Sequence, residues 1–137
     1  MSYEILEHTA DEKFRATGED IEEVFSEATK AFSEIVKGEQ GDIKYHIEVD
    51  SESLEALLFD FLDRLIFLQD TEGVAVSHAE NMKVEERNQG YFLESDIMVD
   101  KITPAMSFTD VKAPTYNEMK AEYREGEGWV LEAVLDI

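Results

Sequence analysis

The sequence predicts an α+β fold, a layered β-sheet or sandwich of mostly antiparallel strands with two amphipathic helices. Apolar residues recur at helical spacing in two segments, 21–36 and 54–68. Several other segments alternate apolar with polar residues, and most of these lie in the second half of the chain. At 137 residues, with 43% hydrophobic and 33% charged residues, we expect a single domain over residues 1–137.

The first part of the chain predicts two short strands followed by a helix. The strands are expected at 3–6 and 13–17, on either side of a tight turn. Asp20 has the features of a helix N-cap, and Glu23, three residues later, completes a pair of the capping-box type. The helix over 21–36 then has one apolar face and an acidic outer face.

The middle of the chain predicts a half-buried strand and a second helix. Apolar and polar residues alternate over 43–49. The helix over 54–68 is expected to begin at a serine cap, Ser51 or Ser53, and to stop at Gly73. Its apolar stripe is wider than that of the first helix, which indicates either burial between layers or an exposed binding edge.

The rest of the chain has the alternation typical of strands, interrupted by turn signals. A less periodic connection is expected over 101–113. Strands are expected over 74–84 and 91–99, joined by a hairpin turn at 88–90, and then over 119–123 and 129–135.

The charge is strongly negative, with 33 acidic residues against 12 Lys and Arg and a net charge of −21. Proteins that bind a phosphate backbone directly use basic side chains, so strong direct binding to nucleic acid is not expected. An acidic chain can still take part in RNA chemistry by docking onto a basic RNA-binding protein. The alternative is that the acidity serves solubility alone.

Other patterns exclude several classes of protein and site. The chain has no cysteine, which excludes disulfides, thiolate nucleophiles and cysteine-type zinc sites. It has no apolar signal segment and no apolar stretch of membrane-spanning length, so we expect a cytoplasmic protein without membrane contact. The phosphate-binding, dinucleotide-binding, zinc-protease and serine-hydrolase motifs are all missing.

The two ends of the chain contain the candidate site. The turn that contains Asp11 could lie beside the end of the last strand. The oxygens of Asp11, Asp136 and the carboxylate at Ile137 would then lie close together, which is the chemistry of a Mg²⁺ or Ca²⁺ site. Each acid also has a simpler interpretation: Asp136 could be a solvated acid, and Asp11 could bond its own backbone in an Asx-turn.

Two further residues are functional candidates. His8 could be a metal ligand, a proton shuttle or a hydrogen-bonded turn residue, and no second histidine sits at ligand spacing. Lys112 could pair with a carboxylate, contact a phosphate or dock on a partner; an ordinary surface ion pair is the alternative. His46 and His78 are assigned no role.

Four segments together resemble one known family. They are YEILEHTAD at 3–11, LLFDFLDRLIFLQD at 57–70, VKAPTYNEM at 111–119 and WVLEAVLDI at 129–137. With these segments the sequence is similar to archease, a small family associated with tRNA splicing, over nearly its full length.

The resemblance implies a protein that is not an enzyme itself. Archease-like proteins promote guanylylation of the RtcB-type RNA ligase and allow it to turn over repeatedly in tRNA splicing, so contact with tRNA would be indirect, through the ligase. They are associated with a bound divalent metal, taken as calcium. Matched by motif, the metal ligands would be Asp11, Asp136 and Ile137, and His8 and Lys112 are functional candidates.

The chain departs from the family pattern at three positions. The family commonly has a β-branched residue at position 114, a histidine at 117 and an apolar residue at 12, where this chain has Pro114, Asn117 and Glu12. Asn117 can donate and accept hydrogen bonds but cannot shuttle a proton near neutral pH. Glu12 would either add a carboxylate to the site or point to water.

Two rival functions follow from the same residues. A stand-alone metal-dependent hydrolase would use Asp11, Asp136 and His8 as its site. A chaperone-like binding module would use the broad apolar helix at 54–68.

Overall fold

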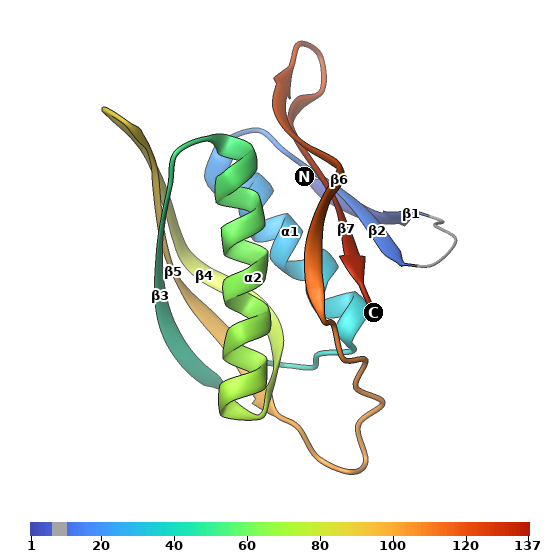
Figure 1. Cartoon of the computed structure of the whole chain (residues 1–137). Coiled ribbons are helices and arrows are strands. Elements are labelled where there is room, and N and C mark those ends of the chain that lie inside the picture. Colours follow the sequence, from blue (N-terminus) through green and yellow to red (C-terminus); the bar gives the residue numbers. More distant parts are fainter. Residues whose placement is uncertain (7–10) are drawn as a thin grey trace.

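The computed structural model describes residues 1–6 and 11–137, so His8 lies outside the described residues. The described residues form two helices and seven strands, and the strands make up two sheets (Figure 1). In chain order the elements are β1 (Ser2–Leu6), β2 (Glu12–Gly18), α1 (Ile21–Val36), β3 (Ile43–Ser51), α2 (Leu54–Glu72), β4 (Val74–Arg87), β5 (Gly90–Lys101), β6 (Ala113–Arg124) and β7 (Gly128–Asp136).

Both sheets are antiparallel, and the helices lie between them. One sheet has the strand order β1-β2-β7-β6 and the other β3-β5-β4. Figure 1 shows the two sheets on opposite sides of the helices, and α1 contacts strands of both sheets. The predicted α+β class of layered antiparallel strands is confirmed. No helix in the described part of the chain is long and apolar enough to cross a bilayer.

The helix ends follow the predicted capping chemistry. The Asp20 carboxylate accepts a hydrogen bond from the Glu23 backbone N–H at 2.8 Å. For α2 the cap is Ser53, whose hydroxyl oxygen accepts from the Ala56 N–H at 3.1 Å. Gly73 ends α2 in the left-handed conformation, at φ 66°, which glycine adopts without steric cost.

The core lies between the sheets and includes the apolar faces of both helices. The rings of Phe25 in α1 and Phe61 in α2 meet edge to face, with centroids 5.7 Å apart. The wide apolar stripe of α2 is therefore explained by burial between layers. Its buried apolar residues are Leu57, Leu58, Phe61, Leu62, Leu65, Ile66 and Leu68.

The prediction for β6 was wrong in its extent, because the strand begins at Ala113 instead of near 119. The register against β7 shifts between Thr115 and Lys120, and Glu118 has a φ of 59°. This bulge breaks the period-two pattern, so the first half of the strand gives no alternation signal. Pro114 is compatible with a strand here because β6 is at a sheet edge, where a missing N–H is tolerated.

Candidate functional site

The start of β2 and the end of β7 lie side by side (Figure 1). The last pair in this antiparallel ladder joins Glu12 to Leu135. Asp11 immediately precedes this pair on one strand, and Asp136 immediately follows it on the other. Both acids therefore lie at the same end of the ladder, although more than a hundred residues separate them in sequence.

Lys112 reaches the same place from the other side of β7. Its backbone N–H donates to the carbonyl oxygen of Asp136 at 2.8 Å, and Ala113 is the β6 partner of Asp136. The side chains of Lys112 and Asp136 are exposed, and Asp11 is half-buried. The structure thus brings Asp11, Lys112 and Asp136 together at one end of the sheet, which we call the acidic end.

The donor set at the acidic end suits a hard cation. Carboxylate oxygens are the ligands that Ca²⁺ and Mg²⁺ prefer. Within the described residues, no group of three or more His, Asp or Glu side chains is placed to hold a metal ion. An ion at the acidic end would therefore need oxygens beyond these side chains. Ile137, which follows Asp136 and is 38% exposed, can offer main-chain oxygens, and water can supply the rest.

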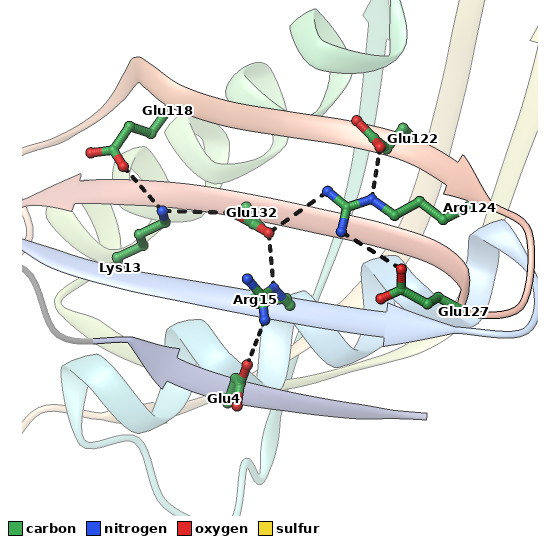
Figure 2. Close-up of polar contacts among 8 residues, drawn as sticks. All are labelled: Glu4, Lys13, Arg15, Glu118, Glu122, Arg124, Glu127 and Glu132. Carbon is green, nitrogen blue, oxygen red and sulfur yellow. Dashed lines mark hydrogen bonds and ion pairs between the residues drawn. The ribbon is translucent and has the colours of Figure 1, made fainter.

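A charged network, which the sequence did not reveal, lies on the outer face of the same sheet (Figure 2). At its centre is Glu132 of β7, whose side chain is only 3% exposed. Arg15 Nε donates to Glu132 Oε2 at 2.8 Å, and Lys13 Nζ lies 3.6 Å from Oε1. Arg124 of β6 lies 4.0 Å from the same carboxylate.

This network joins the strands that contribute to the acidic end. Lys13 also bonds Glu118 in the β6 bulge at 3.1 Å, and Arg15 bonds Glu4 of β1 at 2.9 Å. One buried carboxylate thus links β2, β7 and β6 and, through Arg15, reaches β1.

Comparison with known protein families identifies the family of this chain. The model of the archease protein family (MTH1598/TM1083) matches residues 3–137. The chain belongs to the archease family. It is 36% identical to protein archease of Methanosarcina mazei, over 98% of this chain and 95% of that one. It is 33% identical to protein archease of Pyrococcus abyssi, over 98% of each chain.

Solved archease-type structures agree with this fold. The solution structure of Methanobacterium thermoautotrophicum protein 1598 is similar with a TM-score of 0.83 at 30% identity, covering 99% of each chain. The crystal structure of an archease from Thermotoga maritima, described as a possible chaperone, has a TM-score of 0.63 at 23% identity and covers 96% of this chain and 94% of that one. The second likeness concerns the fold alone.

The three residues that the resemblance marked as departures from the family pattern lie on β2 and β6. Glu12 is half-buried opposite Leu135, next to Asp11. Pro114 is buried, also opposite Leu135, on the β6 side. Asn117 lies exposed in the β6 bulge, where its backbone N–H donates to the Thr115 hydroxyl at 3.0 Å.

The ion pairs of Glu132 predict a pH-dependent contribution to the stability of the fold. Burial alone would raise the pKa of Glu132, but the hydrogen bond from Arg15 and the nearby positive charges of Arg15, Lys13 and Lys120 outweigh burial and lower it. A carboxylate whose pKa is lowered on folding stabilises the protein above its unfolded pKa, about 4.3 for Glu. That stabilisation is lost as the pH falls through the lower, folded value.

We therefore expect Glu132→Gln to lower the free energy of unfolding near pH 7 by about 1–3 kcal/mol, since it replaces the charged acceptor of the Arg15 hydrogen bond with a neutral amide oxygen. The difference from the parent protein should shrink as the pH drops below about 4.3. Urea unfolding at a series of pH values measures both effects. Glu125→Gln, at the exposed β6–β7 turn, is the control, and an equal loss in that variant would contradict a special role for Glu132.

Proposed function

We propose that this protein is a non-enzymatic activator of an RtcB-type RNA ligase, which promotes the ligase's guanylylation and its repeated turnover in tRNA splicing. One observation supports this proposal most strongly: Asp11, Lys112 and Asp136 lie together at one end of the sheet. An end of this kind, with an exposed acid and an exposed cation, can enter the active-site cleft of another protein.

In this proposal Asp11, Asp136 and the main-chain oxygens of Ile137 hold a divalent metal, which we take to be calcium. When bound, such an ion neutralises negative charge and orients phosphate oxygens. Lys112 adds an exposed ammonium group beside Asp136, suited to a nucleotide phosphate. Its backbone N–H donates to the Asp136 carbonyl oxygen, so the two backbones are held side by side at this end of the sheet.

The charge of the chain supports action through a partner. A net charge of −21 disfavours direct contact with RNA and favours encounter with a basic RNA-binding surface. In our proposal the chain reaches tRNA only indirectly, through the ligase. Lowering the salt concentration should speed this association, because the attraction between opposite charges is screened by salt.

A ligation assay with limiting ligase tests the proposal. With substrate in large excess, the ligase alone should stop after about one product per ligase molecule, and addition of this protein should allow many. The protein with metal but without ligase should yield no product, because in our proposal it has no catalytic site of its own. Product formation without ligase would favour the rival hydrolase, and an unchanged yield with ligase would contradict activation.

The chaperone-like alternative has less support from the structure. It relied on the wide apolar stripe of α2 as an exposed binding edge, and that stripe is buried between the sheets. Phe67 is the strongly exposed apolar side chain of α2, at 58%. A single exposed aromatic ring does not form the broad apolar surface that a general chaperone needs.

A further inference from the structure

The four edges of the two sheets are protected to different degrees. Unpaired edge strands attract other chains, and proteins protect them by making them short or bulged. In the described residues, β1 has only five residues, β4 has two register shifts and β6 has one. By contrast β3 pairs with β5 in continuous register over all nine of its residues. The edge formed by β3 is therefore regular over nine residues, without the register shifts of β4 and β6.

A groove runs between this edge and α2. It is a hollow of about 420 Å³, lined on one side by three consecutive β3 residues, Glu48, Val49 and Asp50. On the other side it is lined by Asp60, Asp63, Arg64 and Phe67 of α2. An edge strand beside a helix is a geometry that proteins use to bind an extended peptide, which adds one strand to the sheet.

The residues that line the groove favour a positively charged ligand. Four of the lining residues are acidic, and one is an arginine. Ser51 donates a hydrogen bond to Asp60 Oδ2 at 2.6 Å, which fixes that carboxylate in place. Arg64 lies 5.9 Å from the ring centre of Phe67, and the ring keeps most of its surface exposed. The groove thus combines negative charge on both walls with one apolar contact.

We propose that this groove binds an extended basic peptide segment of a partner protein by strand addition to β3. Side chains of an extended peptide alternate between the two faces of the sheet. One set would meet Glu48 and Asp50, and the other would meet Asp60, Asp63 and Phe67. Lysine or arginine side chains of the peptide would suit the acidic residues met by both sets, and one apolar side chain would pack against Phe67. In Figure 1 β3 and the end of β7 lie on opposite sides of the helices, so this site is separate from the acidic end and goes beyond the proposed activation.

A labelled peptide tests this proposal on the intact protein. The probe is a fluorescein-labelled heptapeptide in which lysine alternates with valine, phenylalanine and valine, titrated by fluorescence anisotropy at physiological salt. A second version has N-methyl groups on alternate amides, so it keeps the charge and side chains but cannot pair with a strand edge. We expect the N-methylated peptide to bind about tenfold more weakly, a loss of about 1.4 kcal/mol.

Matched variants separate the groove from general charge attraction. Asp63 and Phe67 are both exposed on α2, so Asp63→Lys and Phe67→Ser should leave the fold intact and each weaken binding about tenfold. Glu125→Lys makes the same charge change at the exposed β6–β7 turn, and we expect less than about a twofold effect. In amide hydrogen exchange, bound peptide should slow exchange at residues 48–50.

Three results would overturn the proposal. The N-methylated peptide could bind as tightly as the parent peptide, or Glu125→Lys could weaken binding as much as Asp63→Lys. Either would show attraction to net charge alone. Absence of binding by the parent peptide at concentrations up to about 1 mM would also exclude the site.

Discussion

Asp11→Asn and Asp136→Asn are each expected to abolish the proposed binding of a divalent cation at the acidic end. Both changes keep the size of the side chain but replace a charged carboxylate with a neutral amide, which binds a hard cation more weakly. The loss should exceed the roughly 10–100-fold effect of removing an outer-shell partner of a metal ligand. Calorimetric titration with calcium chloride measures it.

The double variant gives the sharper result. If Asp11 and Asp136 hold one ion, the first substitution already destroys the site, and Asp11→Asn with Asp136→Asn should bind no worse than either single variant. Glu125→Gln removes one negative charge at the opposite end of β7 and should bind normally. If the losses of binding free energy in the two single variants simply added in the double variant, the two acids would not share an ion.

Phe61→Ala is expected to destabilise the fold by about 3–5 kcal/mol. Phe61 is fully buried in α2, and its ring packs edge to face against Phe25 of α1. Truncation would leave a cavity between the two helices, in the layer that both sheets cover. Urea unfolding followed by circular dichroism measures the change in the free energy of unfolding.

Phe67→Ala is the matched control on the same helix. Because 58% of Phe67 is exposed, its truncation should change the free energy of unfolding by no more than about 0.5 kcal/mol. Similar losses in the two variants would contradict the placement of α2 between the sheets.

Local patterns in the sequence were sufficient to predict the helices and most strands. Asp20 and Ser53 are caps whose signal lies within three residues of the group that they bind, and Gly73 ends α2 by its own conformational freedom. The apolar periodicity of the helices depends on nearby residues as well. Such elements can be predicted because their causes are local.

Features that depend on distant residues could not be predicted in the same way. Glu132 lies on the outer face of β7, but its burial depends on Arg15 and Lys13, which reach it only when β2 pairs with β7. The bulge in β6 likewise concealed the first half of that strand. The meeting of Asp11 with Asp136 could be stated only as a condition, because strand order and register are set by tertiary pairing.

The most direct test of the central claim compares two variants in the limiting-ligase assay. Asp136→Asn changes the acidic end, and Glu125→Gln makes the same charge change in the β6–β7 turn, which precedes the other end of β7. We expect Glu125→Gln to restore repeated turnover of the ligase as fully as the parent protein, and Asp136→Asn to restore none. Equal activation by both variants would show that the acidic end does not activate the ligase.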